Sequence, residues 1–476
     1  MKHLKNSLLY LTATVLLGSL PPAAQGQENP EPPKPAAQAY PPLASGEEGV
    51  SPEPRAPALK PDDNPLTGVQ DLTLGTRESR SYWVPGFQFS NTFQNNGPSS
   101  GKSEDWNSVS YFLGSLSIYD SWRRAQLTVN YTGGGSESSS SDLLNSFYHQ
   151  LALTQQFSWW RWRLLFTDQF SYLPETPFGF GGVSTISIPG VGASIGTGLP
   201  GVQGNYSPSQ SIFTGSGSRY SNSSIVQVEY RVSPRTSLTA AGSFGFLRFT
   251  KAGNIENNDT SGSLGYNYRL SERNTLGLQY RFSDFRYLGN PQALKDHVGQ
   301  LAYGRKITGR MALDVFAGSD VTMFRVPIGG ATHQVAFSGQ ATLNYNFAKF
   351  RVWLTYLHGL SNGSGVLIGS NTDQVQTQFS RQLARKWQGS AGFGYAKNRQ
   401  ITGGVIKSSP QDFDTWFGSA GLNHPLGRTA SFSLNYTGRF QSGRQQFCVN
   451  LNCGSSYTQH QIWVGFQWST HPFIIH

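Results

Sequence analysis

Residues 334–358 read QVAFSGQATLNYNFAKFRVWLTYLH and carry the pattern that decides the fold. From Val335 to Phe347, apolar or small side chains alternate with polar or small ones. This alternation is typical of a strand, because neighbouring side chains point to opposite faces. Ala348 and Lys349 form a tight turn, and the alternation resumes at Phe350. A tilted strand of about ten residues crosses a bilayer within a barrel. The stretch therefore predicts a hairpin of two membrane-crossing strands.

The composition restricts the class of protein. The chain has 476 residues, of which 37% are hydrophobic and 13% charged, with 54 Gly, 30 Phe, 21 Tyr and 11 Trp. Soluble domains usually carry about 25% charged residues. Low charge with many aromatics and glycines is typical of a transmembrane barrel, where one face of each strand is apolar. No later segment approaches the ~18 consecutive apolar residues of a spanning helix, and the aromatic content excludes a disordered chain.

The alternating pattern recurs from about residue 87 to 468, and short and long connections follow each other in turn. Short periplasmic turns and longer outer loops are the signature of outer-membrane barrels. The sequence therefore predicts an all-β, transmembrane, antiparallel up-and-down β-barrel of about eighteen strands, with sixteen as the alternative and both termini in the periplasm. The eight short connections are expected near residues 120–123, 157–159, 233–236, 271–274, 308–310, 348–349, 384–386 and 425–428.

Three segments precede the predicted barrel. Residues 1–26 have the features of a secretory signal peptide, because Lys2 and Lys5 precede an apolar run and small residues follow it. Residues 27–65 are rich in Pro, Ala and Glu, so we expect a disordered periplasmic linker. Residues 66–86 are expected to form an entry or plug segment. The export signal predicts a barrel in the outer membrane, in contact with outer-membrane lipid.

The last predicted strand ends in an outward aromatic pair, Phe466 and Trp468, followed by a tail at residues 469–476. A final strand with a terminal aromatic resembles the signal that bacterial outer-membrane proteins present to the barrel-assembly machinery. That resemblance implies the assembly machinery as a partner. The pattern leaves open whether the barrel forms a homo-oligomer.

Side chains opposite the apolar faces are expected to line the lumen. A charge on the lipid face costs about 2–4 kcal/mol at mid-membrane, so these arginines should point inward. Inward arginines attract anions, but they can also pair with interior acids such as Asp168 and Asp314. The candidate lumen and selectivity residues are Arg163, Arg231, Arg269, Arg281, Arg351, Glu229, Gln340 and Gln376. We therefore expect a channel for passive diffusion of small polar or anionic solutes.

The longest predicted loop, residues 174–220, has almost no charge. Its opening PETPFGFGG resembles the Pro-Glu-Phe-Gly-Gly element of the bacterial general porins, whose third loop folds into the barrel and narrows the pore. The resemblance implies a constriction loop that includes Pro174, Glu175, Phe178, Phe180, Gly181 and Gly182. A loop that packs across the mouth of the barrel is the alternative.

Two other functions are compatible with parts of the sequence. The strand number and the internal arginines are similar to those of barrels that export anionic polysaccharide. His358, Ser361, Asn362 and Gly363 resemble the His-x-Ser-Asn-Gly stretch of outer-membrane phospholipases. A histidine and serine three apart lie on opposite faces of a strand unless a bulge intervenes, so the expectation is that the protein is not an enzyme.

Two cysteines, Cys448 and Cys453, lie in one late loop and are expected to form a disulfide in an exported protein. Neither a metal site nor a cofactor is expected, because two thiols without nearby His or acidic partners make a poor metal site. The net charge of +10 does not indicate a nucleic-acid partner, because the signal peptide directs the chain out of the cytoplasm.

Overall fold

The computed structural model describes residues 81–95, 106–139, 146–173, 211–212, 218–250, 254–347, 349–401, 412–427, 429–443 and 457–475. The expected signal peptide, the linker, the PETPFGFGG stretch and both cysteines lie outside these residues. Within the described part of the chain, no helix is long and apolar enough to span a membrane.

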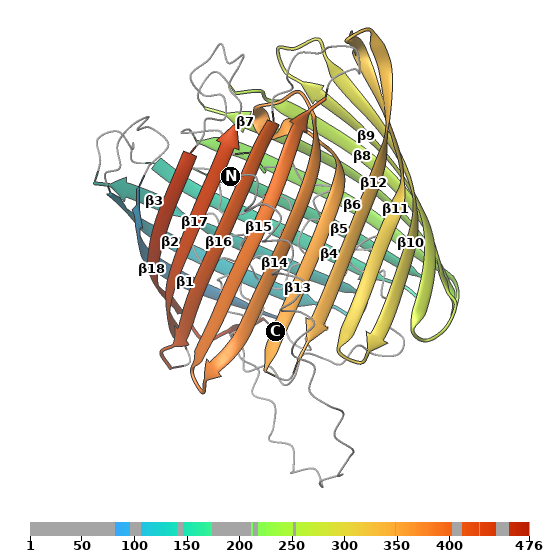
Figure 1. Cartoon of the computed structure of the whole chain (residues 1–476). Helices are drawn as coiled ribbons and strands as arrows, with labels where there is room; N and C mark the ends of the chain where they lie inside the picture. The colour runs from blue at the N-terminus through green and yellow to red at the C-terminus, as the bar shows by residue number, and fades with distance from the viewer. Residues whose placement is uncertain are drawn as a thin grey trace, which may run out of the picture. The chain divides into compact units, whose positions relative to one another are not determined.

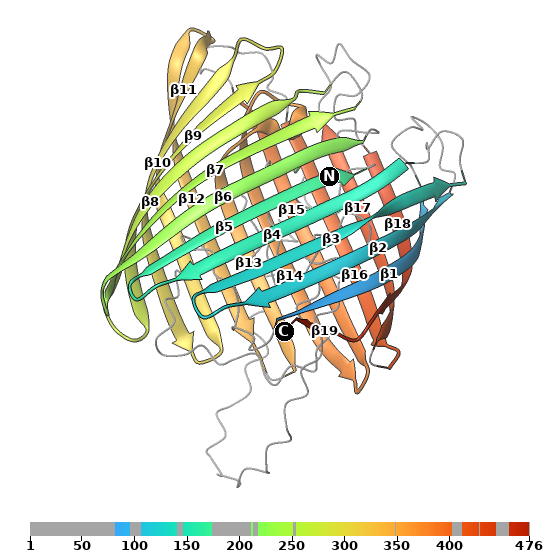
Figure 2. The same ribbon diagram turned by 180° about the vertical axis from the view of Figure 1, so that it is seen from behind.

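The described strands form one antiparallel ring in which each strand pairs with its neighbours in sequence (Figures 1 and 2). The ring closes because β1 pairs with both β2 and β18, and this confirms the predicted eighteen-stranded barrel. The strands are β1 (Ser81–Gln94), β2 (Asn107–Ser121), β3 (Ala125–Ser138), β4 (Ser146–Ser158), β5 (Trp162–Leu173), β6 (Arg219–Ser233), β7 (Thr236–Phe249), β8 (Asn257–Arg269), β9 (Asn274–Tyr287), β10 (Ala293–Thr308), β11 (Met311–Ile328), β12 (Ala331–Asn346), β13 (Phe350–Ser361), β14 (Ser370–Ala384), β15 (Trp387–Gln400), β16 (Asp412–Pro425), β17 (Ala430–Gly443), β18 (Tyr457–Ser469) and the short β19 (Phe473–Ile475).

All eight predicted short connections lie at one end of the barrel, which we call the turn rim. They join β2 to β3, β4 to β5 and so on to β16 and β17. The opposite end, the loop rim, carries the remaining connections. One of these is shorter than expected, since only Gly329 and Gly330 join β11 to β12. Both glycines have positive φ, 58° and 83°, as a two-residue hairpin turn requires.

The seam of the barrel extends beyond the predicted limits. β1 begins at Ser81, inside the segment expected to precede the barrel, and β19 follows β18 within the expected C-terminal tail. Gly86 pairs with Ser469 of β18, and Ser81 pairs with Ile475 of β19. Thr470 donates a backbone hydrogen bond to the Pro85 carbonyl at 3.0 Å. Both ends of the wall therefore meet at the turn rim.

The two faces of the wall differ as the alternation predicts. On β12, Val335 and Phe337 are 65% and 56% exposed on the outside, whereas inward Ser338 is 3% exposed. The inward side chains of most strands are polar, and the buried apolar clusters on the inside are small. An apolar outside and a polar inside define a barrel built to stand in a membrane.

Candidate functional site

Most predicted lumen residues face inward, but several arginines are already paired. Arg163 of β5 forms an ion pair with Glu229 of β6, and Arg231 Nε lies 3.8 Å from Glu229 Oε1. Arg281 Nη2 lies 3.6 Å from Asp296 Oδ2 on β10. Glu229 and Asp296 therefore offset part of the positive charge of these three arginines.

Four of the predicted arginines lie near the turn rim rather than at mid-height: Arg163, Arg231, Arg269 and Arg351. Arg269 ends β8 and donates to the Pro234 carbonyl at 2.7 Å. Arg351 is the second residue of β13. Gln340 of β12 lies on the inward face with Ser338 and Thr342, and inward Gln376 is 1% exposed.

The sequence reading of Asp168 as an interior acid was wrong. Its neighbour Thr167 is 1% exposed and faces inward, so Asp168 faces outward. Asn222 Nδ2 donates to Asp168 Oδ1 at 3.1 Å, and Ser224 Oγ donates to the same oxygen. The three residues form a polar cluster on the outer face.

An inward arginine pair was missed at the sequence level. Arg219, the first residue of β6, is 3% exposed, and Arg439 of β17 is 6% exposed. The strands are not adjacent in the ring, yet the two guanidinium groups interact electrostatically. Nε and Nη2 of Arg219 are buried without a hydrogen-bond partner. The alternation along β17 could have identified Arg439. Arg219 sits at a loop border, where the alternation is not yet established.

A second missed feature is the connection between β13 and β14, residues 362–369, which we call the lumen strap. Asn362 Nδ2 lies 3.4 Å from Asn257 Oδ1 of β8, and Ile255 N donates to the Gly365 carbonyl at 2.7 Å. Because β8 is several strands away from β13 and β14, these contacts carry the strap inward across the ring.

The strap depends on backbone conformations that favour glycine. Gly363, Gly365 and Gly369 have φ of 79°, 80° and 73°, and Ser364 has φ of 56°. A Cβ on Gly365 would lie 2.4 Å from the Phe249 ring. Asn362 and Gly363 thus begin a turn, and this turn belongs to a segment folded inside the barrel.

The predicted constriction loop contributes two described residues to the region beside the lumen strap. Ser211 N donates to Ser364 Oγ at 3.1 Å, and Ser211 Oγ donates to Asn398 Oδ1 on β15 at 2.7 Å. Ile212 packs with Leu367 of the strap and with Phe413 of β16. These two residues of the 174–220 loop therefore lie inside the barrel, against the strap.

The lining near the loop rim includes an apolar cluster. Tyr287, Leu294, Phe324 and Ile401 are buried together, and a Cβ on Gly369 of the strap would meet the Leu294 side chain at 2.3 Å. The strap therefore packs on apolar wall residues at one end and bonds to amides at the other.

The residues of the hydrolase resemblance are not brought together. His358 faces outward, where its Nδ1 lies 2.5 Å from Asp373 Oδ1 and its ring stacks on Phe337. Ser361 faces inward, and its Oγ is 2.7 Å from Ser370 Oγ and 2.9 Å from Thr372 Oγ1. The imidazole cannot accept a proton from a hydroxyl on the other side of the wall.

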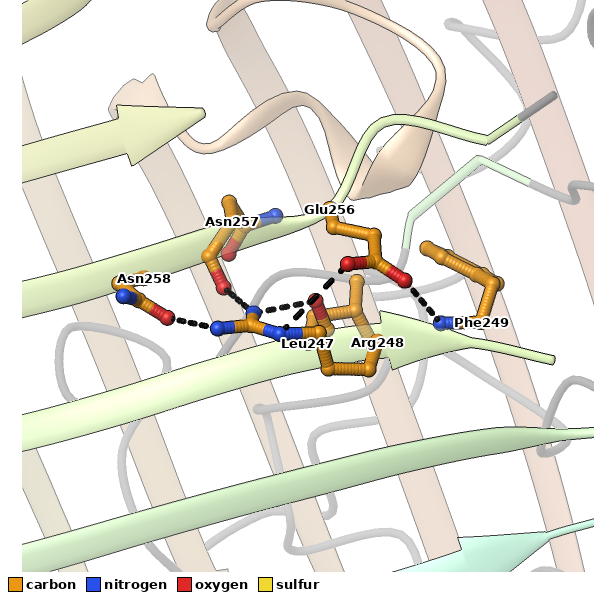
Figure 3. Close-up of polar contacts among 6 residues, drawn as sticks. All are labelled: Leu247, Arg248, Phe249, Glu256, Asn257 and Asn258. Atoms are coloured by element: carbon orange, nitrogen blue, oxygen red, sulfur yellow. Dashed lines mark hydrogen bonds and ion pairs between the residues drawn. The ribbon is translucent and has the colours of Figure 1, made fainter. Parts of the chain in front are cut away.

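One basic residue near the loop rim has a structural role (Figure 3). Arg248 of β7 donates to the carbonyls of Leu247 and Asn257 at 3.0 and 2.6 Å and to Asn258 Oδ1 at 2.5 Å. Its Nε lies 3.6 Å from Glu256 Oε2, and Glu256 in turn accepts from Phe249 N. The guanidinium joins β7 to β8 and has few hydrogen-bond donors left to bind a solute.

No cluster of three or more His, Cys, Asp or Glu suited to a metal ion occurs among the described residues. The candidate site is the inner face itself, where Arg219 is the strand partner of Phe249 and the Phe249 ring lies beside Gly365 of the lumen strap.

The closed ring, its apolar outside and its polar inside make this protein a transmembrane β-barrel. No protein-family model and no curated protein sequence matches the chain. Among solved structures, it is similar to Pseudomonas aeruginosa OpdK with vanillate, with 10% identity over 82% of this chain and 99% of that chain and a TM-score of 0.42. Pseudomonas aeruginosa OpdQ has 8% identity, coverage of 83% and 100%, and a TM-score of 0.42. Acinetobacter baumannii OccAB3 has 10% identity, coverage of 82% and 99%, and a TM-score of 0.39.

Proposed function

We propose that the protein is an outer-membrane channel for passive diffusion of small polar solutes, with a preference for anions. The observation that carries this proposal is Arg219, a buried inward arginine with two unpartnered guanidinium nitrogens beside Arg439. A guanidinium is charged at all physiological pH values, and its donors match the oxygens of an anion. The pair would attract anions and repel cations.

Hydration of the lumen is supported by the polar atoms of the inner face. Asn130 Nδ2 and Oδ1, Gln376 Nε2 and Asn435 Nδ2 are buried without a protein partner. Buried polar groups are seldom left unpaired, so these amides suit water or a passing solute. The predicted roles of Gln376 and Gln340 in the lining agree with this function.

The lumen strap is the proposed narrowest element, together with Ser211 and Ile212. A segment that bonds across the ring favours small solutes over a polymer chain, so the polysaccharide exporter receives no support from the geometry. The opposite-facing His358 and Ser361 likewise favour a channel over a lipid hydrolase.

The orientation of the barrel in the outer membrane follows from the same proposal. Both ends of the wall and all eight short turns share the turn rim, and outer-membrane barrels have short turns on the periplasmic side. We therefore infer that the turn rim is periplasmic and that residues 1–26 direct export. Final-strand contact with the assembly machinery and the Cys448–Cys453 disulfide remain predictions.

A planar-bilayer recording tests the function. The purified full chain should produce steady ion conductance, and a salt gradient should give a reversal potential of the sign expected for anions. A barrel that inserts without conducting would contradict the channel, and a cation-selective current would contradict the role of the arginine pair.

A further inference from the structure

The polar cluster of Asp168, Asn222 and Ser224 lies on a part of the outer face that should be apolar. Leu153 of β4 is the strand partner of Asp168, and Phe244 of β7, 45% exposed, is the partner of Ser224. Val226, 46% exposed, follows on β6. The cluster is thus a polar spot surrounded by outward apolar side chains.

Two aromatic belts show that the cluster is at mid-height. On the loop-rim side, Tyr172 of β5 and Tyr220 of β6 stack at 4.6 Å between ring centroids. On the turn-rim side, Trp162 and Tyr230 of the same strands stack at 4.4 Å. Aromatic rings settle at the two membrane interfaces, so Asp168, which lies between the belts, is at the level of the hydrocarbon.

The loop-rim belt continues along neighbouring strands. Tyr172 faces His149 of β4 at 6.4 Å, and the hydroxyl of Tyr131 on β3 is hydrogen-bonded to His149 Nδ1 at 3.0 Å. This belt marks the interface across four consecutive strands. Other outward charges, such as Arg248, Asp284 and Asp414, lie near the loop-rim ends of their strands. Asp168 does not share that position.

The hydrogen-bonding groups of the cluster are not all satisfied within it. Both hydrogen bonds to Asp168 end on Oδ1, and within the described part of the chain Oδ2 receives none. Asn222 uses one amide hydrogen for Asp168 and has a second one to donate. A carboxylate oxygen without a donor is costly in hydrocarbon, where water cannot replace the missing bond.

We propose that a second copy of this chain covers the outer face of β5–β7 at this cluster. The inference takes the membrane location from the proposed function. A two-fold contact requires a self-complementary patch, and the cluster has both parts: the Oδ2 acceptor and the second Asn222 hydrogen. Each Asn222 would donate to Asp168 of the other copy. Gly242, outward on β7 near the cluster, leaves room for close approach.

Cysteine cross-linking in native outer membranes tests the contact. The background is C448S/C453S, which removes the native thiols. V226C places a thiol beside the cluster without removing any of its hydrogen-bonding groups, and V464C places one on the outward face of β18, away from β5–β7, as the matched control. Oxidation should convert most V226C protein to a covalent dimer and leave V464C monomeric. A dimer from V464C as abundant as that from V226C, or no V226C dimer, would overturn the proposal.

A second variant tests the chemistry of the contact. D168L replaces the carboxylate with an apolar side chain that faces the lipid, and D168N keeps a hydrogen-bond acceptor at the same place. Because one hydrogen bond is lost at each Asp168, D168L should weaken self-association about fivefold in detergent, while D168N retains it. Unchanged association in D168L would contradict the contact; if D168L does not fold, the V226C result decides.

These outcomes are separable from failure of the channel. A non-conducting chain that still forms the V226C dimer would contradict the transport function alone. A conducting chain that stays monomeric would contradict the interface alone. A covalent product of V226C with a different protein would likewise overturn the second-copy occupant.

Discussion

The guanidinium group of Arg219 on β6 interacts electrostatically with that of Arg439, which β17 brings in from another part of the ring. Two like charges held together inside a barrel repel each other, so an anion between them would relieve the repulsion.

Replacing this pair should change ion selectivity. R219Q and R439Q should each lower the anion-over-cation permeability ratio about three- to tenfold, because each removes one positive charge from a narrow part of the lumen. Reversal potentials in a salt gradient measure the ratio. The matched control is R399Q, since Arg399 lies near the same rim but faces outward toward Asp373. Equal effects in R399Q and R219Q would contradict a local role for the pair.

The lumen strap should set the conductance. G365V places a side chain where a Cβ would meet the Phe249 ring at 2.4 Å, and its φ of 80° strains any residue other than glycine. We expect the strap to be displaced and the single-channel conductance to rise. G427A is the control, because Gly427 also has positive φ, at 90°, but it lies in an open turn. An unchanged conductance in folded G365V would exclude the strap as the constriction.

The ion pair of Arg163 and Glu229 should stabilise the folded barrel and reduce the positive charge of the lumen. E229Q leaves the partly buried Arg163 without its counter-charge, which should cost about 1–3 kcal/mol and make the lumen more anion-selective. Denaturant unfolding in detergent measures the first effect, and reversal potentials measure the second. E256Q, at the outer Arg248 contact, should leave the selectivity unchanged.

The seam should depend on β19. The Trp83 and Phe473 rings stack at 4.7 Å between centroids, and aromatic pairs of this kind are worth about 1 kcal/mol. F473A should therefore lower the temperature at which the folded barrel unfolds in detergent. L426A, which truncates a similarly exposed side chain in a turn, serves as the comparison. Equal melting temperatures for F473A and the unmodified chain would mean that β19 does not hold the seam.

The wall could be predicted from the sequence because its rules are local. Side chains alternate with a period of two and tight turns have characteristic residues, so all eight turns of the turn rim were found. The same alternation also contradicts the prediction that Asp168 lies in the interior. Arg163 and Asp168 differ by an odd number of residues on β5, so both could not face inward without a bulge.

The interior could not be predicted in the same way. The strap is an eight-residue connection in sequence, and its inward position depends on Asn257, Ile255 and Ser211, which lie far away along the chain. No local pattern encodes those contacts. Pairing of the inward arginines with interior acids could be foreseen in general, but the partners of Arg163 and Arg281 could not be assigned, because cross-strand pairing depends on register.

The pairing of Ser81 with Ile475 has a consequence for how the chain can be rearranged. Since the first and last wall residues are immediate neighbours, a short peptide could join them, and the polypeptide could be opened instead between β15 and β16. A circular permutant of this kind should close the same ring, because no strand would have to change its neighbours.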